Sequence, residues 1–442
     1  MNDEQGITRR RFITGVGVAT TAAVAAGYGL TVWQQGNDGG TSASSPARTK
    51  PAKLGGREDR TLVVVELGGG NDGLNTVVPM ADPAYLALRP TLGVRDAIPI
   101  DAAIGLAPQL PKLAARYQAG SVAIVEGVGY PDSSLSHFAS LAYWWTGTPG
   151  SGSGAGWIGR YLDGTVGLDD PLAAIGIGPV PSPALIGNRS FATAIADTTG
   201  LQPAPPAWAG TPDELVAAWS RFAPASPDPS TLMGQVQRGI GLTVQARRHL
   251  DKALGTYGDH AALPSDGLPA MSAAATQAQG SYGSSVSASL ALAARLVASD
   301  QQPRVVYVGG LGDYDTHQGL ATRHPALMTD LDNGIETFFT TLDAAGATDR
   351  ALVMTVSEFG RRPRENGSGT DHGTAAPHFV IGSTVKGGRY GAPPSLTQLD
   401  RNGNLAFTTD YRALYATALQ GWLGVDAEAI VGPGFAPLPL LT

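Results

Sequence analysis

The chain has 442 residues, of which 43% are hydrophobic and 15% charged, so it can bury a large core in one big domain or in two or three average ones. Its 30 basic and 37 acidic residues give a formal net charge of −7, which argues against a surface for binding nucleic acid. Cysteine is absent, which excludes disulfides, thiolate metal sites and cysteine nucleophiles and leaves oxygen and imidazole as the strong metal ligands.

The amino terminus has the pattern of a twin-arginine export signal over residues 1–35. The arginines Arg9 to Arg11 precede a mildly apolar stretch of Ala, Gly, Val and Thr that carries no charge before Asp38. An ordinary membrane anchor with a basic start is the alternative, and because no clean cleavage site is visible, an uncleaved signal stays open. Residues 36–58 are rich in Gly, Ser, Thr, Pro and Lys and predict a flexible linker.

This pattern predicts a protein handled by the twin-arginine export machinery and located in the periplasm, at the cell surface or in the medium. Contact with a membrane is expected only through an uncleaved signal.

Strands and helices are predicted to alternate over residues 59–442, which indicates a single α/β domain. The expected strands are residues 61–67, 122–125, 304–308, 351–356 and 379–381, and the expected helices are residues 108–117, 286–297, 327–342 and 411–422. This order favours a mostly parallel mixed sheet between layers of helices. Residues 148–260 are richer in Pro, Gly, Ser and Ala and are expected to form an insertion or cap on this domain.

Polar side chains follow or flank several predicted strands, where the binding crevice of an open α/β sheet lies. Asp72 sits in a glycine turn after the first strand, although a plain turn with a solvated aspartate explains it equally well. Ser136 precedes a predicted helix, where it is either an N-cap or a nucleophile favoured by the free N–H groups of the helix start.

Carboxylates and imidazoles gather in the later loops. Asp313, Asp315 and His317 follow one strand, and Glu358 and Arg361 follow another, although a salt bridge at a helix start also explains the second group. Asp371 and His372 lie between glycines, which suggests a ligand with a supporting partner. We expect a divalent ion, either zinc, calcium, magnesium or manganese, because these are the ions that Asp, Glu and His bind.

In order, the motifs LGGGNDGLNTVVP, SLSHFASLAYWWTG, DYDTHQ, SEFGRRPRENGSGTDHG and DYRALYATALQGWLG resemble the sulfatase-like family of domains of unknown function numbered fifteen hundred and one. That family is similar to the alkaline phosphatase superfamily, and the resemblance implies a metal at the strand ends and a phosphate or sulfate ester as substrate. It implies further that Asp72, Asp313 or Asp315, His317, Glu358 and His372 are metal ligands and that Ser136 is the nucleophile.

Two positions complete this comparison. Phe359 occupies a place where many active relatives have a histidine, so one of two metal sites is expected to be weakened or missing, with Asp371 as a compensating ligand. Arg361 is the candidate for binding a tetrahedral anion, because a guanidinium holds its N–H donors in a fixed planar arrangement.

The resulting hypothesis is an exported, metal-dependent hydrolase of an anionic ester. The alternative is an exported binding or scaffold protein that keeps the fold with a degenerate metal site. A nucleotide cradle at the glycine loop is disfavoured because the loop lacks the Lys-Ser or Lys-Thr ending.

Overall fold

A computed structural model describes residues 56–57, 59–166, 170–178, 181–190, 192–195, 211–223, 228, 231–254, 285–311 and 313–442. The predicted signal segment, residues 1–35, and all of the predicted linker except Gly56 and Arg57 lie outside the described residues. Among the described helices, none combines the length and the apolar character needed to cross a bilayer.

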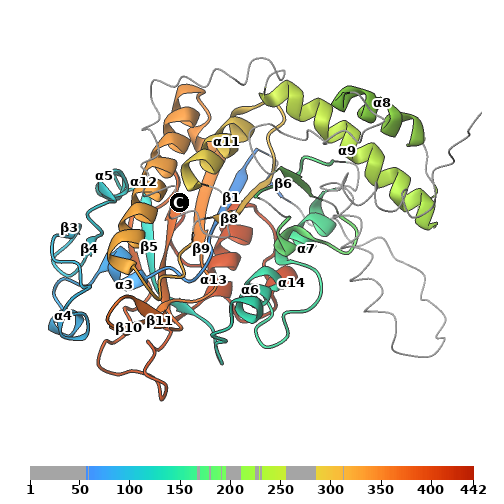
Figure 1. Ribbon diagram of the computed structural model, residues 1–442. Helices are drawn as coiled ribbons and strands as arrows, with labels where there is room; N and C mark the ends of the chain where they lie inside the picture. The colour runs from blue at the N-terminus through green and yellow to red at the C-terminus, as the bar shows by residue number, and fades with distance from the viewer. Residues whose placement is uncertain are drawn as a thin grey trace, which may run out of the picture.

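The centre of the described part is a nine-stranded mixed sheet in which β12 is the one antiparallel strand (Figure 1). Its order is β13 (Gly388–Tyr390), β5 (Val122–Gly129), β12 (Ala376–Ile381), β9 (Ala351–Val356), β1 (Thr61–Leu67), β8 (Val305–Leu311), β6 (Ala174–Ile177) and β7 (Thr193–Ile195), with β14 (Thr409–Asp410) paired to β5. The predicted mostly parallel mixed sheet is therefore confirmed.

The first strand, β1, occupies the middle of this sheet because all of its residues are buried and all but Glu66 are apolar or β-branched. It pairs in parallel with β8 and with β9, in the registers Val63↔Val306 and Thr61↔Ala351. Since parallel neighbours end at the same edge, the loops after these three strands are brought side by side.

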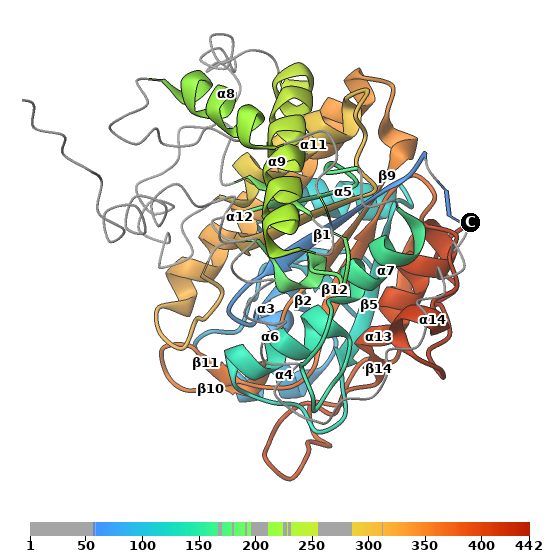
Figure 2. The same ribbon diagram turned by 90° about the vertical axis from the view of Figure 1, so that its right-hand side faces the viewer.

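Helices cover both faces of the sheet, each over its own apolar core (Figure 2). One face is covered by α5 (Pro111–Gln118), α11 (Val286–Ala298) and α12 (Leu320–Ala344), and the other by α6 (His137–Thr146), α7 (Trp157–Thr165), α13 (Tyr411–Ala416) with a π-helical continuation (Thr417–Trp422), and α14 (Glu428–Val431). The helices predicted at residues 108–117, 286–297 and 327–342 correspond to α5, α11 and α12.

Smaller elements complete the described fold. These are α3 (Gly73–Thr76), α4 (Pro83–Leu88), the three-stranded sheet of β2 (Val77–Val78), β4 (Gly105–Leu106) and β3 (Ile98–Pro99), the ribbon of β10 (Arg361–Glu365) and β11 (Thr370–His372), and 3₁₀ turns at Pro183–Leu185 and Thr348–Arg350.

The segment predicted as an insertion, residues 148–260, is only partly separate from the main body. It supplies α7 to one core and the strands β6 and β7 to the edge of the large sheet. Beyond these, α8 (Pro212–Phe222) packs on α9 (Leu232–Leu254), which contacts α11. The intervening residues 196–210, 224–227 and 255–260 lie outside the described residues.

Candidate metal centre

Loops from three neighbouring strands meet with the start of α6 and the end of β11 at one edge of the large sheet (Figure 1). Residues 68–72 follow β1, residues 313–317 follow β8 and residues 357–360 follow β9. Residues far apart in sequence are thereby brought into contact, as in the 2.8 Å hydrogen bond from the Gly69 amide to Glu358 Oε1, which joins residues 289 positions apart.

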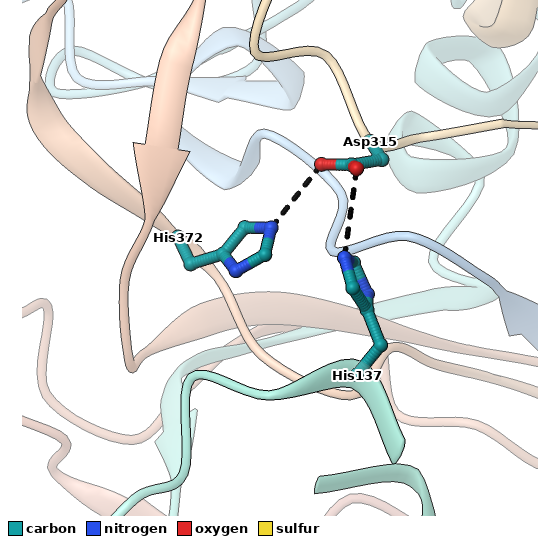
Figure 3. Close-up of side chains that lie close together, drawn as sticks. All are labelled: His137, Asp315 and His372. Carbon is teal, nitrogen blue, oxygen red and sulfur yellow. Dashed lines mark hydrogen bonds and ion pairs between the residues drawn. The ribbon is translucent and has the colours of Figure 1, made fainter.

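Three potential metal ligands, His137, Asp315 and His372, point toward one another here (Figure 3). One ligand atom from each lies within 4.8 Å of the other two. Asp315 Oδ2 is 3.5 Å from His137 Nε2, and Asp315 Oδ1 is 3.2 Å from His372 Nε2. The three residues come from α6, from the loop after β8 and from β11, so the cluster exists only in the folded chain.

His317 is a fourth member of this cluster. Its Nε2 lies 2.9 Å from His372 Nε2 and 3.4 Å from Asp315 Oδ1. The structure therefore gathers His317, Asp315 and His372 from the predicted ligands and adds His137, to which the sequence analysis assigned no role. We call these four residues the histidine cluster.

The other ring nitrogen, Nδ1, of each histidine faces a hydrogen-bond acceptor. His137 Nδ1 is 2.8 Å from Glu358 Oε1, and His317 Nδ1 is 3.2 Å from Asp371 Oδ1. His372 Nδ1 is 2.8 Å from the backbone carbonyl oxygen of Leu135. Because a carbonyl can only accept, His372 must donate from Nδ1, and the carboxylates favour the same tautomer for the other two rings.

When all three rings are neutral, as metal ligands must be, this tautomer leaves their Nε2 lone pairs on the side of Asp315. Two lone pairs 2.9 Å apart repel unless a cation lies between or beside them. Neighbouring ligand atoms of a tetrahedral zinc ion lie about 3.3 Å apart, given zinc–nitrogen bonds of about 2.0 Å. The separations of 2.9, 3.2 and 3.4 Å among His317 Nε2, His372 Nε2 and Asp315 Oδ1 are close to that value, so the donor set fits a small divalent ion.

Charge at the cluster is concentrated on Asp315 and His137. Although partial burial alone would raise it, hydrogen bonds from two histidines and Arg361 hold the pKa of the Asp315 carboxyl far below its usual range. Hydrogen bonds to Asp315 and Glu358 raise the pKa of His137 to about 9. Without a bound metal, His137 is therefore mainly protonated at neutral pH and pairs with the Asp315 and Glu358 carboxylates.

Arg361 has a different environment from the one predicted. Its guanidinium is completely buried and donates to the carbonyl oxygens of Gly70 (2.7 Å) and Thr370 (2.8 Å) and to Asp315 Oδ1 (2.5 Å). A buried side chain whose donors already have partners is not available to a substrate. The geometry therefore does not favour the predicted binding of a tetrahedral anion by Arg361. Instead, Arg361 ties the glycine loop to Asp315 and fixes the orientation of the carboxylate.

Glu358 and Asp371, both predicted as ligands, lie behind the histidines and accept from their Nδ1 atoms. Phe359 packs against the rings of His137 and His372, with centroid separations of 5.0 and 4.4 Å. An apolar ring thus occupies the place where a further ligand was expected, which is consistent with one metal site rather than two.

Asp72 and Asp313 are both engaged by arginines. Asp72 is fully buried and its Oδ1 lies 2.6 Å from Arg89 Nη1, while its Oδ2 accepts from the Thr370 hydroxyl. Asp313 Oδ2 pairs with Arg323 Nη2 at 2.6 Å. Of the two aspartates that the sequence left undecided, the structure brings Asp315 to the cluster. The role of Asp72 as a metal ligand stays a prediction. Its pairing with Arg89 does not favour that role.

Ser136 is the N-cap residue of α6, but its hydroxyl makes no capping hydrogen bond. The residue is exposed, and both of its sequence neighbours touch the cluster, Leu135 through its carbonyl oxygen and His137 through its ring. The simple explanation for this serine, a side-chain cap, therefore does not hold. Ser136 therefore sits between two residues that contact the cluster, at the positive end of a ten-residue helix.

Sequence reasoning missed His137, Arg89 and the bracing role of Arg361. A histidine directly after a helix-start serine was the one available signal for His137. The partners of Arg89 come from positions as far apart as Asp72 and Pro363, and no local pattern links them.

The fold and the cluster together define an α/β protein with a histidine-rich candidate metal centre at the strand ends. Residues 234–433 match the family described as "Protein of unknown function (DUF1501)", so the resemblance predicted from the motifs is confirmed over this part of the chain. The matched part contains Asp315, His317 and His372 but begins after Ser136 and His137.

Several solved structures are similar to this chain at low identity. A protein in the alkaline phosphatase superfamily from Vibrio parahaemolyticus is 12% identical over 87% of this chain and 71% of its own, with a TM-score of 0.39. The lipoteichoic acid synthase LtaP from Listeria monocytogenes is 10% identical over 76% and 71%, with a TM-score of 0.32. A Mg-bound variant of the alkaline phosphatase of the Antarctic bacterium TAB5 is 10% identical over 75% and 94%, with a TM-score of 0.29. No curated protein matches the sequence.

Proposed function

We propose that this protein is an exported, metal-dependent hydrolase of phosphate or sulfate esters that uses Ser136 as its nucleophile. The observation that carries the proposal is the arrangement of His137, His317 and His372, whose Nδ1 atoms are each held by an acceptor while their Nε2 atoms face Asp315. Metal-binding histidines in proteins typically have this second hydrogen bond.

His137, His317, His372 and Asp315 would hold the ion. Three imidazoles and one carboxylate favour zinc or a similar transition metal over calcium and magnesium, which prefer oxygen ligands. Such an ion would supply positive charge that lowers the pKa of a nearby hydroxyl and stabilises charge developing on ester oxygens.

Ser136 supplies the attacking oxygen in this proposal. Its Oγ forms a bond to phosphorus or sulfur while the bond to the leaving oxygen breaks, and the serine proton passes overall to the leaving alcohol. Water then releases phosphate or sulfate from the serine and restores its hydroxyl. The N-terminal end of α6 favours negative charge at this position, so the helix assists both steps.

Other residues position these groups. Arg361 holds the Asp315 carboxylate through a 2.5 Å contact, and Glu358 holds the His137 ring at 2.8 Å. Because Phe359 lies against two of the imidazoles, it restricts their rotation.

Replacing the serine tests the mechanism. In the Ser136→Ala protein we expect turnover of 4-nitrophenyl phosphate or 4-nitrophenyl sulfate to fall by about a thousandfold, with metal content by elemental analysis unchanged. Ser133→Ala is the matched control, because the Ser133 hydroxyl is turned away to the Tyr130 carbonyl oxygen at 2.6 Å. Unchanged hydrolysis in Ser136→Ala would remove the serine from the mechanism.

A non-catalytic binding protein is the second candidate, and the apolar wall formed by Phe359 favours it. Absence of turnover of both esters by the metal-loaded wild-type protein would support this candidate against the hydrolase.

Export by the twin-arginine machinery is also part of the proposal and is supported by the amino-terminal sequence alone. A double Arg9→Lys, Arg10→Lys variant should accumulate inside the producing cell. Equal export of this variant and the wild type, measured by cell fractionation, would contradict the proposal.

A further inference from the structure

A second site lies at the same strand-end edge, beyond the glycine loop from the histidine cluster. It is a cavity of about 450 Å³ between α3, β2, the start of β12 and the loop at residues 393–396. Its walls are mainly aliphatic and proline side chains, including Val77, Ile104, Pro377 and Leu396. This size and lining are typical of small-molecule sites, in which an apolar wall carries a few polar groups.

One buried carboxylate, that of Glu126, lines this apolar cavity. The Glu126 side chain is only 7% exposed, and its Oε1 accepts from Arg389 Nε at 2.6 Å. Its second oxygen, Oε2, makes no hydrogen bond or ion pair with any of the described residues. Because Oε2 is not one of the fully enclosed side-chain atoms, it stays accessible in the cavity wall and can accept a hydrogen bond from a ligand.

The charged groups around Glu126 indicate whether a cationic or an anionic ligand is favoured. Arg389 is shared between Glu126 and Asp101, at 2.6 and 3.2 Å, so these three groups carry one excess negative charge. The other arginine at the wall, Arg361, is turned to backbone carbonyls and Asp315 and has a fully buried side chain. A further lining carboxylate, Asp82, caps α4 by accepting from the Ala84 amide. A cation is therefore favoured over an anion.

We propose that this cavity binds a small aliphatic amine, with its apolar body against the proline and aliphatic wall and its ammonium group on Glu126 Oε2. The proposal does not depend on metal binding or turnover at the histidine cluster.

Three matched probes test the proposal on the wild-type protein by isothermal titration calorimetry at pH 7, with the two charged probes below their critical micelle concentrations and octanol below its solubility limit. We expect octylammonium to bind at least roughly tenfold more tightly than octanoate, with octanol between them. In the Glu126→Gln protein, octylammonium should bind no more tightly than octanol, because the amide keeps the shape and the acceptor for Arg389 but removes the charge. Equal binding of octylammonium and octanoate by the wild type, or an unchanged preference in Glu126→Gln, would overturn the proposal.

A substitution that blocks the cavity entrance tests whether octylammonium binds in this cavity. Ala81 lies at the exposed rim of the cavity, so Ala81→Trp should fill the entrance without disturbing the core and should abolish binding of octylammonium. Ala102→Trp, also exposed but outside the lining, is the control and should bind as the wild type does. Octylammonium binding that survives Ala81→Trp would place the amine elsewhere and overturn the proposal.

Discussion

The proton on Nδ1 decides what each histidine of the cluster can do. Glu358 holds it on His137, Asp371 on His317 and the Leu135 carbonyl oxygen on His372. Of the two carboxylates, that of Glu358 is 1% exposed and that of Asp371 is 50% exposed. Asp371 can therefore be changed with little effect on packing, which makes it the cleaner test of this contact.

Asp371→Asn should weaken metal binding by about tenfold or more, because an amide oxygen is a poorer acceptor for His317 Nδ1 and leaves the ring less basic. The measurement is competition for the metal against a chelator of known affinity. Asp96→Asn, at an exposed position outside the cluster, is the control. Equal metal affinity in wild type and Asp371→Asn would show that Asp371 does not support a ligand.

His137 gives the metal-free protein a dependence on pH. Hydrogen bonds to Asp315 and Glu358 raise its pKa to about 9 from the ordinary 6.5. A raised pKa in the folded state means that the protonated ring stabilises the protein fully below about pH 6.5 and loses this contribution as pH rises toward 9.

In chelator-treated protein, the free energy of unfolding should therefore be higher for wild type than for His137→Asn at pH 6, and the difference should shrink by pH 9. Urea denaturation of both proteins at each pH measures this. A difference that stays constant or grows with pH would contradict the ion pairs assigned to His137.

At the scale of elements, the loop after β1 must pass very close to the histidine cluster. Gly70 has a φ of +81°, and a Cβ there would lie 2.4 Å from the Phe359 ring. Gly120, after α5, has nearly the same φ, +80°, but a Cβ there would meet nothing within 4 Å. Alanine at Gly120 would therefore test backbone strain alone, whereas alanine at Gly70 would test strain together with steric contact.

Gly120→Ala should cost about 1–2 kcal/mol of stability from the positive φ alone. Gly70→Ala should cost about 1–3 kcal/mol more, because Phe359 has to move, and it should also weaken metal binding since that ring packs on His137 and His372. Chemical denaturation and metal titration of both variants test this. Equal losses of stability would mean that the loop does not press on Phe359.

Elements with a strong periodic pattern could be predicted from the sequence, and those fixed by distant partners could not. The strands at Thr61–Leu67 and Ala351–Val356 were predicted with the bounds that the structure has, because each is dominated by consecutive apolar and β-branched residues. The short strands β6 and β7 carry no such signal, and their place at the sheet edge depends on the pairing of β6 with β8 and of β7 with β6. Residues 148–195 were for this reason assigned to an insertion.

For the whole molecule, the sequence predicted a mixed, mostly parallel sheet between helices and placed the polar chemistry at its strand ends. It could not rank the carboxylates, because their pairing with Arg89, Arg323 or a histidine depends on residues 10 to 221 positions away along the chain. Asp315 and Asp313 have equivalent sequence settings, and the structure separates them only through their partners.

X-ray absorption spectroscopy of the metal bound to the purified protein tests the central claim most directly. The arrangement of the cluster predicts one ion per chain surrounded by three imidazole nitrogens, from His137, His317 and His372, and by carboxylate oxygen from Asp315. A coordination shell made of oxygen atoms, without the scattering pattern of imidazole rings, would contradict the account.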